Sequence, residues 1–114
     1  MIERYTRKEI KEIWKDYNRY SIWLNIELAA AEAMEKYKVI PKGVVKKVKS
    51  KAKINPKRIL QIESKVKHDI IAFLTSITEK VGKEARYLHK GMTSSDVLDT
   101  CFNLQLKQLS LIHI

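Results

Sequence analysis

Apolar side chains recur along this chain at helical spacing, and no segment shows the alternation typical of a strand. After a capping box formed by Thr6 and Glu9, four apolar residues follow at i, i+3, i+4 and i+7: Ile10, Ile13, Trp14 and Tyr17. The pattern resumes near Arg19 in a segment rich in Ala, Leu and Glu, with expected inward positions at Ile22, Ile26, Ala29, Ala30, Ala33 and Tyr37. Because Asp and Asn favour caps over helix interiors, we expect a break at residues 16–18.

Start and stop signals predict the remaining helices. Pro41 suits the first turn of a short helix that carries Val44, Val45, Val48 and Ala52, and Asn55-Pro56 combines a cap with a first-turn proline. A stronger helix begins around Lys67, with one apolar face made of Ile70, Ile71, Phe73, Leu74, Ile77 and Val81, and Gly82 is placed to end it. Residues 83–92 are expected to form a connector before a last helix that starts at residues 93–96. We predict an all-α fold of about six helices, with residues 1–114 in a single domain.

Length and composition exclude several classes of protein. A chain of 114 residues can bury one modest core, and its three Gly and two Pro are too few for an all-β sandwich. The single cysteine, Cys101, excludes an internal disulfide and a cysteine-based zinc site. His68 and His89 lack the carboxylate pattern of a metal site, so no metal is expected. With no apolar run of membrane-spanning length and no signal segment at the N-terminus, we expect a cytoplasmic protein.

The net charge of +10 is concentrated in one stretch. Residues 36–62 hold ten basic side chains and no acidic one, and we call these ten the lysine stripe: Lys36, Lys38, Lys42, Lys46, Lys47, Lys49, Lys51, Lys53, Lys57 and Arg58. The rest of the chain is neutral. A small basic helical module that binds nucleic acid through this stripe is therefore the alternative function. Against it, the stripe has one Arg and no interleaved aromatic residues for base stacking, and a lysine-rich helix face is more often simply solvated.

Three clusters could carry chemistry. Arg4-Tyr5 offers a guanidinium fork and a hydroxyl suited to phosphate oxygens, although on these residues alone an exposed terminus is the better explanation. Lys67-His68-Asp69 stands at the start of an apolar helix, where an anion is favoured, and the alternative is a first-turn acid beside a surface histidine.

The third cluster runs from His89 to Asp96 and gathers an imidazole, a glycine, three hydroxyls and a carboxylate. Hydroxyls and free amides together can hold a ligand carboxylate. The simpler interpretation makes Thr93 or Ser94 a helix cap with Asp96 at the third position, but a cap needs only one hydroxyl and leaves His89 unexplained.

Together these stretches resemble the adenylosuccinate lyase family of the fumarase/aspartase superfamily. The resemblance rests on Met1-Ile-Glu-Arg-Tyr5, on residues 19–41 and 63–73 with Lys67-His68-Asp69, and on His89-Lys-Gly-Met-Thr-Ser-Ser-Asp-Val-Leu-Asp-Thr100. The last two motifs, about twenty residues apart, are hard to reach by chance. The resemblance as a whole covers nearly the entire chain, in the register of the family's N-terminal domain and without its long central helical bundle.

The resemblance implies a cofactor-free β-elimination. A succinyl group is removed from the nitrogen of adenylosuccinate, or of succinyl-aminoimidazole-carboxamide ribotide, releasing fumarate and AMP or the carboxamide ribotide. It implies that Arg4 and Tyr5 contact the nucleotide, that Lys67, His68 and Asp69 line the site with His68 near the phosphate, and that Thr93 and Ser94 hold the succinyl part. No residue of this segment is assigned a catalytic role. If the segment does supply a catalytic residue, His68 and His89 are the candidates.

The resemblance also implies a homotetramer whose sites are assembled from three subunits. The family's general-acid histidine and serine base lie beyond the position where this chain ends, so we expect the 114-residue chain alone to lack lyase activity. Residues 110–114 stray from the family's continuation, as a truncated or non-native tail would, and His113 receives no role. A structural piece that only pairs with other subunits is a third possibility. No membrane partner is expected.

Overall fold

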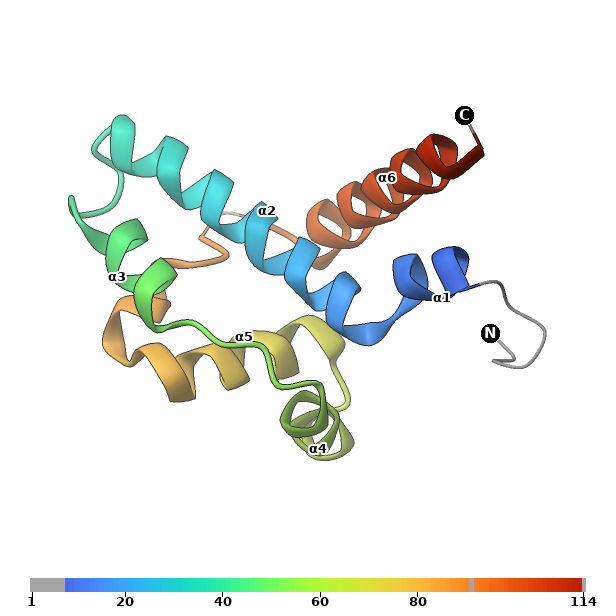
Figure 1. Ribbon diagram of the computed structural model, residues 1–114. Coiled ribbons are helices and arrows are strands. Elements are labelled where there is room, and N and C mark those ends of the chain that lie inside the picture. The colour runs from blue at the N-terminus through green and yellow to red at the C-terminus, as the bar shows by residue number, and fades with distance from the viewer. Residues whose placement is uncertain (1–7, 91, 114) are drawn as a thin grey trace.

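The computed structural model describes residues 8–90 and 92–113, and within these ranges it contains helices and no strand (Figure 1). The α-helices are α1 (Lys8–Trp14), α2 (Asp16–Lys36), α3 (Val44–Lys51), α4 (Pro56–Val66), α5 (Asp69–Val81) and α6 (Ser94–His113), and a 3-10 helix, η2 (Lys83–Tyr87), follows α5. The all-α prediction is confirmed. Among the described residues, no helix combines the length and apolarity that crossing a membrane needs.

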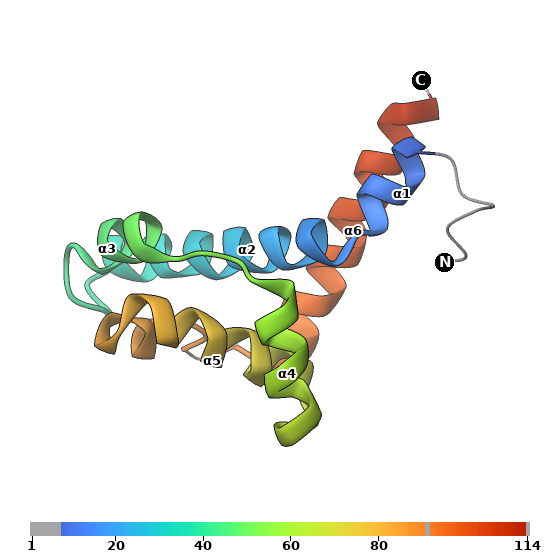
Figure 2. The same cartoon turned by 60° about the horizontal axis from the view of Figure 1, so that its bottom comes forward.

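The helices form two groups. Figure 2 shows α2 and α3 lying over α5, with α4 crossing at the start of α5, while α6 passes the start of α2 and then rises beside α1. The closest helix pairs agree with this view, since α4 packs on α5, and α6 packs on both α2 and α1. The predicted N-terminal helices thus meet the last helix of the chain. Contacts between distant segments therefore hold the two ends of the chain together.

Local capping residues set most helix ends where the sequence predicts them. The Asn55 side chain accepts a hydrogen bond from the backbone N–H of Arg58, and Pro56 opens α4. Gly82 ends α5 at a φ of 91°, a left-handed value that favours glycine. The prediction for Pro41 was wrong, because α3 begins only at Val44, after Gly43 at a φ of 93°. The expected connector contains η2.

Our expected inward face of α2 was right at Ile22 but wrong at its alanines and at Tyr37. The residues buried on this helix are Tyr20, Ile22, Trp23, Glu27, Leu28 and Ala31, whereas Ala29, Ala33 and Tyr37 are exposed. An Ala-rich helix is apolar on several sides, so spacing alone leaves its rotation ambiguous. The large rings of Tyr20 and Trp23 decide the rotation, because burying them removes far more area from water than burying alanines does.

Three aromatic rings form the centre of the core. The rings of Tyr20, Trp23 and Phe73 pack together with centroid separations of 5.1 to 6.1 Å. The guanidinium of Arg19 lies over Tyr20 and Trp23, 5.0 and 5.2 Å from their ring centroids. Trp14, in the apolar stripe of α1, is only half-buried and packs against the exposed Phe102 of α6. The core therefore joins α2 to α5, and the Trp14–Phe102 contact links α1 to α6 outside the core cluster.

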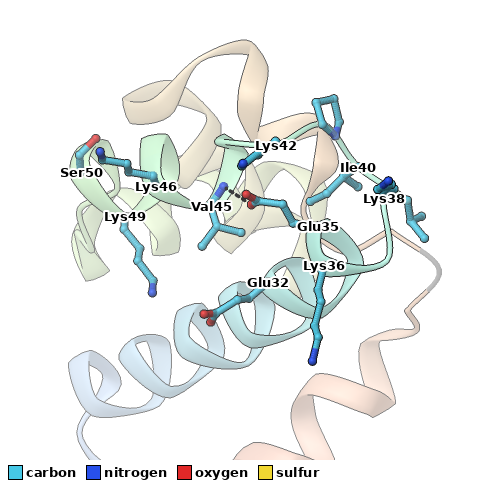
Figure 3. A pocket seen from close by; sticks show the side chains of 12 residues that line it. Glu32, Glu35, Lys36, Lys38, Ile40, Lys42, Val45, Lys46, Lys49 and Ser50 are labelled. Atoms are coloured by element: carbon cyan, nitrogen blue, oxygen red, sulfur yellow. Dashed lines mark hydrogen bonds between the residues drawn. The ribbon is translucent and has the colours of Figure 1, made fainter.

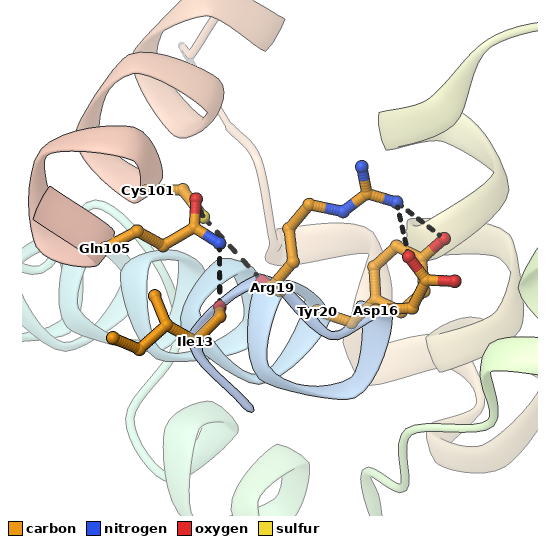
Figure 4. Close-up of polar contacts among 6 residues, drawn as sticks. All are labelled: Ile13, Asp16, Arg19, Tyr20, Cys101 and Gln105. Carbon is orange, nitrogen blue, oxygen red and sulfur yellow. Dashed lines mark hydrogen bonds and ion pairs between the residues drawn. The ribbon is translucent and has the colours of Figure 1, made fainter. Parts of the chain in front are cut away.

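The first two helices are separated by a break, as predicted, but it lies at Lys15 and not within residues 16–18, which are helical, and α6 stabilises it. The break frees the carbonyl of Ile13, which accepts hydrogen bonds from the Asn18 side chain at 2.6 Å and from Gln105 Nε2 at 3.1 Å. Gln105 is buried and also lies 3.8 Å from the thiol of Cys101 (Figure 4). A freed backbone carbonyl thus finds a partner on the far end of the chain, as a buried polar group must.

Candidate functional site

The Lys67-His68-Asp69 cluster forms the junction between α4 and α5. Lys67 ends α4 in the left-handed region at a φ of 55°, and its exposed ammonium makes no ion pair with the described residues. Asp69 Oδ1 accepts the backbone N–H of Ile70 at 2.8 Å. The turn thus places a cation and a carboxylate next to each other at the start of an apolar helix.

His68 is the N-cap of α5, a role the sequence analysis did not assign. Its Nδ1 accepts the backbone N–H of Ile71 at 3.2 Å, so in this arrangement the ring proton of the neutral form is on Nε2. The same Nδ1 lies 3.9 Å from Asp69 Oδ1, which is a weak contact because an accepting nitrogen carries no proton to share. The side chain remains 42% exposed, so a ligand can reach it.

Thr93 is the N-cap of α6, as the simpler interpretation of that turn predicted. Thr93 N–H donates to Asp96 Oδ2 at 2.9 Å, and Asp96 N–H donates to Thr93 Oγ1 at 3.4 Å, which is a reciprocal capping box. The Thr93 hydroxyl acts here as an acceptor, so its own proton remains available to a ligand oxygen. Capping and ligand binding are therefore compatible at this residue.

His89 pairs with a residue that the sequence analysis missed. Its Nδ1 lies 2.6 Å from Oε1 of Glu27, a carboxylate in the middle of α2 that is 1% exposed. The available signal was a lone acidic residue four positions after the large apolar Trp23, which places both on one face of a helix. The structure thus ties the third cluster to α2.

The remaining predicted residues lie beyond what the structure describes. Arg4 and Tyr5 are outside the described residues, and only the helical backbone of Ser94 is described. That the start of α5 and the Thr93 turn line one site, as the resemblance implies, stays a prediction. Within residues 8–90 and 92–113, no group of three or more His, Cys, Asp or Glu side chains could hold a metal ion.

A groove of about 1290 Å³ lies elsewhere, between the last turn of α2 and α3 (Figure 3). Its apolar lining is Val39, Ile40, Pro41 and Val45, and five lysines line it as well: Lys36, Lys38, Lys42, Lys46 and Lys49. At the base of the groove, the Glu35 carboxylate already accepts hydrogen bonds from the backbone N–H groups of Gly43 at 2.9 Å and Val45 at 3.3 Å. No predicted site residue lines this groove, and the described residues lining it include neither an arginine nor an aromatic ring.

The lysine stripe is distributed over the end of α2, α3, the connector that follows it and α4, and does not lie along a single helix. Figures 1 and 2 place α3 near the end of α5 and α4 at its start, so the charges are divided between two corners. Arg58 is engaged by Glu79 through two hydrogen bonds of 2.9 and 2.7 Å, and Lys47 pairs with Glu84 at 3.5 Å. Part of the excess charge is therefore balanced by carboxylates of the fold.

Comparison with known proteins finds a relative and a structural neighbour, while no family model matches the chain. The adenylosuccinate lyase of Synechocystis sp. (strain ATCC 27184 / PCC 6803 / Kazusa) is 51% identical over 106 residues, which cover 93% of this chain and 25% of the relative. This chain thus spans about a quarter of the length of the curated relative it matches. A crystal structure of fumarate lyase from Mesorhizobium sp. BNC1 superposes with a TM-score of 0.84 at 22% identity, over 95% of this chain and 26% of that one, which supports the fold.

Proposed function

Because this chain belongs to the adenylosuccinate lyase family, as an N-terminal segment of it, we propose that it supplies one wall of a site for adenylosuccinate. The single observation that carries the proposal is the 51% identity over 93% of the chain. In the proposed reaction a base removes a proton beside a substrate carboxylate, the C–N bond breaks, and an acid protonates the leaving nitrogen. Fumarate and AMP, or the imidazole-carboxamide ribotide, are released.

In this proposal the clusters bind the substrate's anionic ends through side chains. The backbone amides of Ile70 and Ile71 at the start of α5 are already taken by Asp69 and His68. In this proposal the phosphate contacts therefore come from the Lys67 ammonium and the His68 ring, and not from these two amides. At the other turn, the Thr93 hydroxyl has its proton left to donate to a succinyl carboxylate.

We also propose that the chain acts in the cytoplasm as part of a homotetramer. The support is the exposed apolar surface of α6, on which Phe102, Leu104, Leu106 and Leu111 are 38% to 64% exposed. Large exposed apolar side chains along one helix are typical of a surface that other chain segments cover. Light scattering of the purified chain tests this, since a monomer at all concentrations would show that α6 alone does not drive assembly.

The binding proposal is tested by titrating the 114-residue chain with AMP and following the ring resonances of His68 and His89 by NMR. Two substitutions separate binding from capping. His68→Ala removes both the imidazole and the cap of α5, whereas His68→Asn keeps an acceptor at the cap. We expect His68→Asn to retain wild-type stability and to lose the AMP response. Unchanged AMP affinity in His68→Asn, or no response in the wild type at millimolar AMP, would contradict the proposed contact.

We expect no fumarate release by this chain alone, because the proposed acid and base belong to the part of the family that it does not span. The measurement is fumarate absorbance with adenylosuccinate as substrate. Activity in the purified chain that His68→Asn abolishes would show that the reaction needs only these residues.

The nucleic-acid alternative is less well supported by the structure. The divided stripe and the groove without arginine or aromatic rings provide little for base stacking. A column of immobilised DNA tests it directly. Retention at about 0.15 M salt, with an affinity that falls steeply as salt is raised, would favour the alternative.

A further inference from the structure

Glu27 and His89 form a polar pair in which the carboxylate is fully buried and the imidazole is partly exposed. We propose that Glu27 is a positioning residue, which holds the His89 imidazole by Nδ1 and so presents Nε2 to a small anionic ligand. The nature of that ligand rests on the proposed function, but the orientation of the ring does not.

The pair joins distant parts of the chain. Glu27 lies in the middle of α2 and His89 in the turn between η2 and α6, 62 positions later, with 2.6 Å between Oε1 and Nδ1. The Glu27 side chain is fully buried, while that of His89 is 21% exposed. The carboxylate is therefore the fixed, inner partner, and the imidazole is the outer one.

A gain in folding stability does not by itself explain why the Glu27 carboxylate is buried beside His89. The second oxygen of Glu27, Oε2, is buried without a hydrogen-bond partner in the described part of the chain. Burying a carboxylate that is only half satisfied costs free energy, and a well-packed apolar residue would often serve the core as well or better. A buried group retained at such a cost suggests a role in orienting its partner.

The backbone conformation of His89 also costs free energy, in addition to the burial of Glu27. Its φ of 62° is in the left-handed region, which residues other than glycine adopt with difficulty. Such conformations persist where surrounding contacts enforce them, and they are concentrated at binding sites. The Glu27 contact and the backbone conformation act together, because both fix the direction in which the ring leaves the chain.

The opposite nitrogen of the ring is left for a ligand. Nε2 makes no hydrogen bond with the described residues and is not among the buried unpaired atoms, so solvent reaches it. A carboxylate on Nδ1 favours the proton there, as in the carboxylate–histidine pairs that orient metal ligands and catalytic imidazoles. Nε2 then accepts from a ligand when the ring is neutral, and donates to an anion when the ring is protonated.

The orientation is tested by long-range 1H–15N NMR of the His89 ring in the 114-residue chain. We expect a proton on Nδ1 in the wild type and a larger share of the tautomer with its proton on Nε2 in Glu27→Gln, because a neutral amide can either accept from Nδ1 or donate to it and so no longer favours the proton there as a carboxylate does. The matched control is Glu32→Gln, an exposed glutamate on the same helix, which should leave the ring spectrum unchanged. An unprotonated Nδ1 in the wild type would overturn the proposal, and this measurement needs no variant to fold. A Glu27→Gln ring spectrum identical to that of the wild type would also overturn it.

A titration with AMP separates this proposal from the proposed function. We expect AMP to bind Glu27→Gln about ten- to a hundredfold more weakly than the wild type, by analogy with other histidine-orienting partners. Equal AMP affinities would overturn the positioning role while leaving the proposed function intact. A wild type with Nδ1 protonated but without any response to AMP would instead contradict the proposed function and support the orientation.

Discussion

The ring of Trp23 on α2 stands edge-on to the ring of Phe73 on α5, with 5.5 Å between the centroids and 82° between the planes. Neither residue is exposed to solvent. Edge-to-face contact is a favoured geometry for aromatic pairs and adds to the free energy gained by removing both rings from water. This contact is therefore a main link between the helix that carries Glu27 and the helix that His68 caps.

Replacing Phe73 tests that link. We expect Phe73→Ala to lower the free energy of unfolding by about 3–5 kcal/mol, because it removes a buried ring and leaves a cavity. Ile71→Ala is the control, since Ile71 is on the same helix but 50% exposed. Urea denaturation followed by circular dichroism measures both. Similar losses of unfolding free energy in the two variants would show that the Trp23–Phe73 contact contributes no more to stability than an exposed side chain of α5.

Glu35 provides the N-terminal cap that α3 lacks in its own sequence. No acid lies in the first turn of α3, and Glu35 accepts N–H groups from Gly43 and Val45. We expect Glu35→Ala to reduce the free energy of unfolding by about 1 kcal/mol, as loss of a cap does. Glu32→Ala should change it less, because Glu32 makes no hydrogen bond to the described residues. If both variants lose the same amount, helix propensity and not capping explains the effect.

Burial raises the pKa of the Cys101 thiol, which is 2% exposed. A group with a raised folded pKa gives stability that is present below its unfolded pKa and is lost as pH rises through the folded value. We expect slow labelling by a thiol reagent in the native state, fast labelling in urea, and a stability that declines at alkaline pH. Cys101→Ala should remove the thiol's part of that decline. Labelling of the native chain at the rate of free cysteine would contradict the burial.

Arg58 and Glu79 form a surface ion pair that joins α4 to α5. The hydrogen bond from Arg58 is the main reason why the pKa of Glu79 is lowered from its usual value of 4.5. A lowered folded pKa gives stability that is present above the unfolded pKa and is lost as pH falls through the folded value. We expect Arg58→Lys, which cannot form the two-bond contact, to melt slightly below the wild type at pH 7. The difference in Tm should begin to shrink as pH falls below 4.5 and should vanish only once Glu79 is protonated in the folded chain as well. A constant difference down to pH 2 would show that the pair is not its source.

Local signals were enough for the helices whose ends are capped within a few residues. Asn55-Pro56 and Gly82 were identified from the sequence, and the structure confirms both, because capping involves only neighbouring backbone groups. The start of α3 was missed because its cap is not local. Its cap comes from Glu35 on the preceding helix, and no spacing rule within α3 could reveal that.

The candidate site likewise contains residues that the sequence identified and one residue that it did not. The sequence identified His68, Thr93 and His89 as residues of interest, and the motifs that contain them carried the family resemblance. It did not identify Glu27, because a glutamate within a helical pattern is ordinarily assigned to the solvated side.

The sequence by itself determined the fold class, most helix ends and the family, because these depend on local spacing, caps and motif order. Only the tertiary structure decided which face of α2 is buried and that Glu27 meets His89, since both depend on large side chains from distant segments competing for one interior. The rotation of an Ala-rich helix is set by the partners it packs against, and a single helix cannot specify those partners.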